Sequence, residues 1–306
     1  MARAHLALAA AFAGALAITP SVAVAYPLLD GLGGPSGFGN DSLIENDDGS
    51  SSSIDIGTAF PSGLHFFTST WRALFLNNNG NVTFNAGLFE YTPGAFPVAD
   101  QPMIAPWWAD VDTRGQGPLT TAGVFWHITP GRFVATWHNV GYFASHFDHR
   151  NDFQLILTDR SADNAPGDFD VEFRYNRCEW VTGDASGGSG GFGGTPAQAG
   201  FDAGNRRDFF ALPGSRTMAI LDVCHTSNVA TPGRWIFSIR AGEVLPYDLG
   251  SERPDAGPQL LLEGRAGPCF CSIPGAMRPR FDIARSLGVL AFVTLFAQRR
   301  RRSSAG

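Results

Sequence analysis

The sequence predicts a mainly β protein: an antiparallel, sandwich-like single domain with a signal helix at the N-terminus and a sorting helix at the C-terminus. The first observation is composition, because the 306 residues include 25 Phe and 7 Trp, which suit a pleated, half-buried surface. The second is the supply of turn formers, 37 Gly and 20 Pro. The third is an alternation of apolar and polar residues, which is typical of strands with one buried face.

The N-terminus has the features of a signal peptide. Arg3 precedes an apolar run over residues 6–18, and small residues up to Ala25 then provide a site that a signal peptidase accepts. We therefore expect Sec-dependent export, a signal peptide over residues 1–25 and a secreted mature chain that begins at Tyr26.

The mature domain is expected over residues 26–241 and contains the predicted strands. Its polar residues 27–58 are expected to wrap the domain edge. The clearest strand covers residues 168–175 (DFDVEFRY), whose polar face is expected to contact water. Its apolar face holds Phe169, Val171, Phe173 and Tyr175. Similar patterns predict strands over residues 124–128, 132–138, 151–158 and 233–239.

A β-hairpin is predicted over residues 75–85 (FLNNNGNVTFN). Asn79 and Gly80 can both adopt the positive φ angles that a two-residue primed turn requires, and strand-forming residues flank them. A turn of this kind is structural and says nothing about activity.

The segment APWWADVDTRG, residues 105–115, combines two tryptophans, two aspartates and an arginine. On an extended backbone Asp110 and Asp112 would lie on the same side, about 6.6 Å apart. That spacing is compatible with a glycosidase pair or with one edge of a calcium site. The alternative is bracing, in which one aspartate accepts N–H bonds from the adjoining turn and the other pairs with Arg114. We favour bracing, because one short segment cannot assemble a catalytic site.

The glycine run over residues 183–194 formally contains the patterns G-x-G-x-x-G and G-x-S-x-G. Both motifs need a following helix, whereas Thr195 and Pro196 lead into no helical pattern. The run therefore predicts a mobile loop.

The histidines and cysteines suggest one metal alternative and one disulfide. Zinc or copper could be ligated by His138, His146 and His149, but these residues lack Cys partners and a helical frame, so we favour ordinary loop histidines. Cys178 and Cys224 lie in the exported domain, where an oxidising compartment favours a disulfide.

The C-terminal region is predicted to be a linker followed by a sorting signal. Residues 242–268 contain several Pro and Gly and form the linker. Residues 269–306 begin with Cys269 and Cys271, continue through an apolar run over residues 287–297 and then reach an arginine cluster. This order resembles the C-terminal sorting signals of Gram-negative bacteria, and its Cys-containing form is similar to the MYXO-CTERM type.

The resemblance to a sorting signal implies processing at the membrane. A processing enzyme would remove the tail and leave the protein at the cell surface or outer membrane of a Gram-negative bacterium. Before processing, the apolar run would contact the membrane. The alternative is a permanent transmembrane helix, although the run is shorter than the roughly 20 residues that a stable spanning helix needs.

The order of motifs in the mature domain resembles the nidogen-like (NIDO) domain family. The resemblance covers roughly residues 38–240 and rests on FLNNNGNVTFN, on APWWADVDTRG and on the strand FDVEFRY that leads to Trp180. It implies an extracellular domain associated with cell–matrix adhesion, and the family has no established catalytic residue set. The chain differs from the family pattern in lacking EGF-like neighbours, because each of those needs six cysteines and the whole chain has four.

The predicted function is therefore non-catalytic adhesion at the cell surface. The partners would be extracellular matrix or an envelope protein or polysaccharide, contacted through the glycine run and residues 141–151. No cofactor is required, and calcium at Asp110 and Asp112 is the only addition considered. A net charge of −6 disfavours nucleic acid as a partner.

Two other functions remain open from the sequence. The first is an exported hydrolase that acts on extracellular polysaccharide and pairs Asp110 or Asp112 with a distant carboxylate such as Glu172 or Asp202. The second is a structural envelope protein that assembles with itself.

Overall fold

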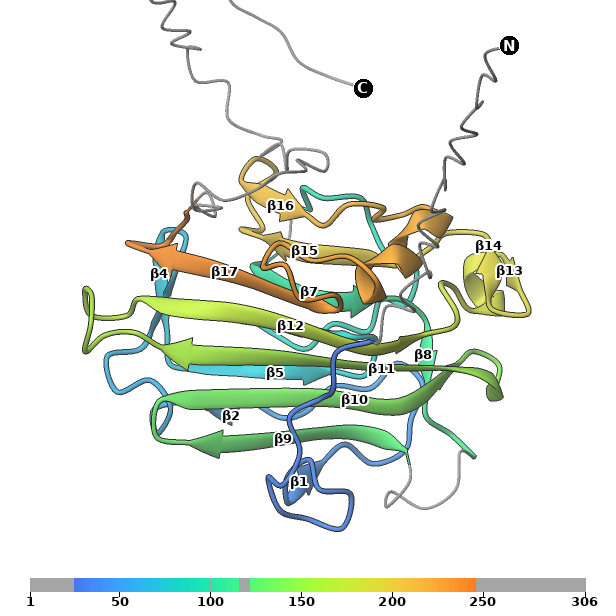
Figure 1. Cartoon of the computed structure of the whole chain (residues 1–306), viewed down its shortest axis with the longest axis horizontal. Helices are drawn as coiled ribbons and strands as arrows, with labels where there is room; N and C mark the ends of the chain where they lie inside the picture. The colour runs from blue at the N-terminus through green and yellow to red at the C-terminus, as the bar shows by residue number, and fades with distance from the viewer. Residues whose placement is uncertain (1–24, 99–100, 116–121, 246–306) are drawn as a thin grey trace, which may run out of the picture. The chain divides into compact units, whose positions relative to one another are not determined.

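The structure is a computed structural model that describes residues 25–98, 101–115 and 122–245. The chain divides into two compact units, Met1–Arg265 and Ala266–Gly306, and every described residue belongs to the first. In that unit two antiparallel sheets pack against each other with the core between them, and Figure 1 shows the larger sheet in front of β5 and β2. The mainly β, sandwich-like fold predicted from the sequence is confirmed.

The larger sheet has eight strands in the order β1-β9-β10-β11-β12-β17-β18, with β8 paired to one end of β10. Its long central strands β10, β11 and β12 follow one another in the chain, as expected for short hairpin connections. The bounds are β1 (Asp41–Ser42), β8 (Val111–Asp112), β9 (Gly123–Thr129), β10 (Arg132–Tyr142), β11 (His146–Asp159), β12 (Phe169–Cys178), β17 (Arg234–Arg240) and β18 (Glu243–Val244).

The smaller sheet has six strands in the order β16-β15-β7-β6-β5-β2. They are β2 (Ile54–Asp55), β5 (Ala73–Asn77), β6 (Asn81–Thr83), β7 (Met103–Trp108), β15 (Gln198–Asp202) and β16 (Phe209–Ala211). Two hairpins and two 3-10 helices complete the described part: β3 (Leu64–Phe66) with β4 (Ser69–Trp71), β13 (Gly188–Ser189) with β14 (Phe192–Gly193), η1 (Asp184–Ser186) and η2 (Met218–Cys224).

The core forms where the apolar faces of the two sheets meet. The predicted alternation in β12 is confirmed, because its four apolar residues from Phe169 to Tyr175 are fully buried. The strands predicted over residues 124–128, 132–138, 151–158 and 233–239 all exist, as β9, β10, β11 and β17. One continuous cluster includes Leu76, Val82 and Ile104 from the smaller sheet and Phe133, Leu155 and Phe173 from the larger.

The polar face of β12 carries ion pairs. Glu172 accepts hydrogen bonds from the Nε atoms of Arg174 at 2.7 Å and Arg234 at 2.9 Å. Both guanidinium groups also lie over the ring of Tyr26, at 5.0 and 5.6 Å from its centroid. Burial opposes ionisation of Glu172, but the hydrogen bonds and positive charges of the two arginines outweigh it and lower the pKa of this carboxyl group.

The β5–β6 hairpin differs from the primed turn that its sequence predicts. Asn77 pairs with Asn81, so the loop has three residues, and Gly80 takes a left-handed conformation (φ 78°) while Asn79 does not. Such loops combine a type I turn with a glycine in the left-handed region. Glycine is also required by space, because a Cβ at residue 80 would lie 1.8 Å from the backbone oxygen of Trp107.

The expected disulfide between Cys178 and Cys224 is present and joins the end of β12 to the end of η2. The predictions for residues 1–24, for the linker beyond residue 245 and for the tail with Cys269 and Cys271 lie outside the described residues. Ala25, the predicted last residue of the signal peptide, is the first described residue. Within the described part, no helix is both long enough and apolar enough to cross a membrane.

Removing the disulfide should destabilise the domain. The bridge spans a sequence separation of 46 residues, so its loss frees a long loop in the unfolded chain and costs about 3–4 kcal/mol. Replacing both Cys178 and Cys224 with Ala should therefore lower Tm by about 6–15 °C in thermal unfolding followed by circular dichroism. A Tm equal to that of the oxidised wild type would contradict this expectation.

Acid should weaken the Glu172 ion pairs. Because the pKa of Glu172 in the folded protein lies below its ordinary value of 4.5, its contribution to stability is fully present above that pH. The contribution is lost as the pH falls through the folded-state pKa. Glu172→Gln should lower Tm at neutral pH and lower it progressively less in more acidic buffers. A constant difference from the wild type across the acid range would contradict this account.

Candidate functional site

The segment between β7 and β8 turns a corner instead of continuing as one strand. The N–H of Val111 donates to the backbone oxygen of Ala109 at 2.9 Å, which closes a tight three-residue turn centred on Asp110. The chain thereby leaves the smaller sheet after Trp108 and joins the larger sheet at Val111. The alternation expected for an extended strand over residues 105–115 therefore fails at this corner.

Asp112 is the bracing residue of this segment. Its buried carboxylate accepts hydrogen bonds from the backbone N–H of Arg114 at 2.9 Å, from Nε of Arg114 at 2.9 Å and from the N–H of Ser145 at 2.9 Å. Nη2 of Arg114 lies 2.7 Å from its second oxygen. Burial alone would raise the pKa of Asp112, but these hydrogen bonds and the arginine charge lower it. Asp112 therefore provides both forms of bracing by itself: it pairs with Arg114, and it accepts hydrogen bonds from backbone N–H groups.

Asp110 is in a different environment. The residue is only 1% exposed, and its Oδ2 atom has no hydrogen-bond partner among the described residues. Space for the carboxylate depends on Gly183, since a Cβ there would lie 2.4 Å from that Oδ2. Burial, followed by the negative charges of Asp47, Asp48, Asp112 and Asp184, raises the pKa of Asp110 to about 7.

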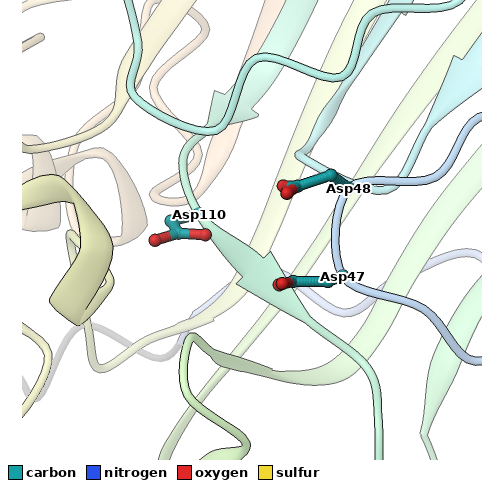
Figure 2. Close-up of side chains that lie close together, drawn as sticks. All are labelled: Asp47, Asp48 and Asp110. Carbon is teal, nitrogen blue, oxygen red and sulfur yellow. The ribbon is translucent and has the colours of Figure 1, made fainter.

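Two further aspartates, which the sequence reasoning did not single out, face Asp110. Asp47 and Asp48 lie in the loop between β1 and β2, and Figure 2 shows their carboxylates directed toward Asp110. One oxygen from each of the three residues lies within 4.8 Å of the other two. We call Asp47, Asp48 and Asp110 the acidic corner. The calcium hypothesis had paired Asp110 with Asp112, but the structure brings Asp110 together with these two residues.

The electrostatics of Asp47 resemble those of Asp110. Its Oδ1 is buried without a hydrogen-bond partner in the described part of the chain, while Oδ2 lies 3.1 Å from Nη2 of Arg114. Burial and the charges of Asp112 and Asp48 raise the pKa of Asp47 to about 6, although Arg114 acts in the opposite direction. Two carboxyl groups of the acidic corner therefore resist ionisation.

Asparagines of the β5–β6 turn hold the acidic corner together. The side-chain amide of Asn78 donates to the backbone oxygens of Asp47 and, at 2.6 Å, of Val111. Asn79 donates from Nδ2 to Oδ1 of Asp48 at 2.9 Å and accepts the N–H of Val111 at 3.0 Å. The sequence signal for this arrangement is the run of asparagines in NNNGN together with the aspartate pair in ENDDG.

The two segments predicted as contact surfaces lie beside each other. The N–H of Asp184 donates to the backbone oxygen of Phe143 at 3.1 Å, and the rings of His149 and Phe192 are 5.3 Å apart. Figure 1 shows the tip of β10–β11 near β13 and β14. The sequence predicts a mobile loop for the glycine run, and in the structure the run contains η1 and the β13–β14 hairpin.

The other candidate ligands and acids are engaged elsewhere. Nδ1 of His138 lies 2.8 Å from Asp152, and Nε2 of His146 lies 3.2 Å from Asp184. Among the described residues, the acidic corner is the one group of three or more His, Cys, Asp or Glu residues placed to hold a metal ion. Asp202 accepts the N–H groups of Val98 at 2.9 Å and Gly204 at 2.6 Å, and Glu172 is held by arginines.

Comparison with known proteins identifies a family. The family model described as "Nidogen-like domain" matches residues 72–123 and 128–241. Alpha-tectorin of Mus musculus is 36% identical over 230 residues, which is 65% of this chain and 10% of that protein. Nidogen of Drosophila melanogaster is 30% identical over 234 residues, or 64% of this chain and 16% of that protein.

The shared region is a small part of these relatives, since the chain spans about a tenth of the length of alpha-tectorin. Dendrite extension defective protein 1 of Caenorhabditis elegans is 25% identical over 241 residues, 68% of this chain and 19% of that protein. No solved structure matches the chain. The family match includes Asp110, whereas Asp47 and Asp48 precede its first residue.

The bracing role of Asp112 can be tested by Asp112→Asn. The amide would turn its N–H donors toward the donors of Arg114 and Ser145, so we expect the free energy of unfolding to fall by about 2–4 kcal/mol in urea. Asp163→Asn is the matched control, because Asp163 is exposed in the turn after β11 and should change stability by less than about 0.5 kcal/mol. Equal effects of the two substitutions would refute the role.

Proposed function

The chain belongs to the nidogen-like domain family, and from this premise we propose that it is a secreted or cell-surface adhesion protein that binds extracellular matrix without catalysing a reaction. The observation that carries the proposal is the family match across both sheets of the described domain. The relatives alpha-tectorin and nidogen are extracellular matrix proteins and not enzymes. The proposal concerns the region that the chain shares with them.

We place the binding surface at the end of the sandwich where the β10–β11 tip and the glycine hairpin meet. This contact face consists of residues 143–149 and 184–193. Three of its side chains are well exposed: His146 at 41%, Asp148 at 60% and His149 at 39%. Loops positioned by a rigid sheet scaffold commonly carry binding residues. A matrix protein, or an envelope protein or polysaccharide, is the class of partner that we assign to this face.

We also propose export by the Sec route and retention at the surface of a Gram-negative bacterium. Residues 1–25 have the pattern of a signal peptide, and the tail over residues 269–306 has the order of cysteines, apolar run and arginine cluster described above. The Cys178–Cys224 disulfide fits an oxidising compartment. Retention would keep the contact face available to the surrounding matrix.

The proposal predicts saturable binding of the purified full chain to cell-free extracellular matrix prepared from its own organism. Ala185→Arg inserts a bulky cation into the contact face, because Ala185 is exposed in η1, and should weaken binding at least tenfold. Ala162→Arg is the matched control, since Ala162 is exposed beyond the opposite end of β11 and should leave binding unchanged.

The absence of wild-type binding, or equal binding by both arginine variants, would overturn the proposal. Sedimentation velocity at several protein concentrations covers the rival function of self-assembly. An assembly that grows with concentration, in a chain that does not bind matrix, would favour a structural envelope protein.

A further inference from the structure

We propose that Asp47, Asp48 and Asp110 form a calcium-binding site that joins the loop between β1 and β2 to the corner between β7 and β8. This proposal stands apart from matrix binding, because it rests on the side chains of the acidic corner and not on the family match. Its starting point is geometric: three carboxylates from distant parts of the chain converge, each with an oxygen within 4.8 Å of the others (Figure 2).

The buried and unsatisfied oxygen atoms distinguish the acidic corner from an ordinary cluster of surface acids. Asp110 is 1% exposed, and its Oδ2 lacks a hydrogen-bond partner among the described residues. Oδ1 of Asp47 is also buried and also lacks a hydrogen-bond partner among the described residues. A buried acceptor without a partner costs about 1–3 kcal/mol, and more when it is charged. Figure 2 shows one oxygen of Asp110 facing Asp47 and Asp48, and a cation bound there would offset the charge of the three buried or half-buried carboxylates.

The local charge balance also favours a cation. Four aspartates are grouped here, the acidic corner and Asp112, while Arg114 contacts Asp112 at 2.7 Å and Asp47 at 3.1 Å. One guanidinium group cannot offset four carboxylates. Burial is the largest cause of the raised pKa values of Asp110 and Asp47, and the negative charges of the neighbouring aspartates add to it. A divalent ion would remove most of that excess without a change in the fold.

Calcium is the divalent ion that best matches these ligands. The donors of the acidic corner are carboxylate oxygens, which suit hard cations. Its three ligand residues offer no nitrogen or sulfur atom of the kind that zinc and copper prefer. Oxygens on opposite sides of a bound Ca²⁺ can be about 4.6–5.2 Å apart, so the spacing of the acidic corner lies within the range for calcium. Calcium also tolerates irregular ligand arrangements, whereas magnesium demands near-ideal octahedral geometry and releases water reluctantly.

Calcium binding would stabilise the base of the contact face. The backbone oxygen of Asp110 accepts the N–H of Phe143 at the β10–β11 tip, at 3.1 Å. Gly183, which adjoins the Asp110 carboxylate, directly precedes η1 and the glycine hairpin. A cation at Asp110 would therefore stabilise both segments of the contact face from beneath.

The test measures Tm of the full chain after treatment with EDTA, with CaCl₂ added from about 0.1 to about 10 mM, the affinity range of extracellular calcium modules. The wild type should gain about 3–10 °C at the highest concentration. Asp48→Asn and Asp110→Asn should abolish the gain. Asp163→Asn, an equal charge change in an exposed turn, should gain as much as the wild type.

The stability of Asp110→Asn in EDTA distinguishes a ligand role of Asp110 from a structural role. In EDTA, Asp110→Asn should be at least as stable as the wild type, because the substitution removes a buried carboxylate that its neighbours repel. The proposal is overturned if the wild-type Tm does not respond to calcium, if the two aspartate variants still respond, or if MgCl₂ gives an equal gain. None of these results would contradict the matrix-binding proposal, because matrix binding is measured with other variants.

Discussion

Asn78 and Asn79 direct their side chains into the interior, at the place where the chain crosses from one sheet to the other. Backbone groups buried at such a crossing cannot pair within either sheet, so they need other partners. The asparagines supply these partners. The side chain of Asn78 donates to the backbone oxygen of Val111, and the side chain of Asn79 accepts the N–H of Val111. Trp137 of the larger sheet donates to the backbone oxygen of Asn78 at 3.0 Å. The position of every residue in the acidic corner depends on this network.

The network also explains why negative charge is concentrated at the corner. Because Asn78 and Asn79 bind both the 46–49 loop and the β7–β8 turn, Asp48 and Asp110 are brought together although they lie far apart in sequence. Arg114 and Ser145 satisfy Asp112, which leaves Asp110 and Asp47 with unpaired oxygens in the described structure. The fold thus groups negative charge beneath the contact face, and the proposed calcium site and the proposed binding surface both depend on this crossing.

The sequence predicted most of the fold but, of the three residues of the acidic corner, only Asp110. Strands such as β12 were predictable because their apolar face repeats every second residue, and the Cys178–Cys224 disulfide followed from export. Asp110 was singled out, but the tight turn at that residue depends on hydrogen bonds to Asn79 that a single segment does not reveal. Asp47 lies in a polar stretch without periodicity, so only the tertiary structure shows that it meets Asp110. The hairpin within the glycine run was not predictable, because strands as short as β13 and β14 carry no sequence pattern.

The central claim, that the buried asparagine turn positions the acidic corner, is tested most directly by amide hydrogen exchange on Asn79→Ala. The substitution removes an acceptor for the N–H of Val111 and a donor to Asp48. The N–H of Thr113 donates to Asn46, which lies in the same 46–49 loop as Asp48. We expect amide exchange at Val111 and Thr113 to accelerate at least tenfold, while Phe173 in the centre of β12 keeps its protection. Unchanged protection at Val111, or equal acceleration at Phe173, would contradict the claim.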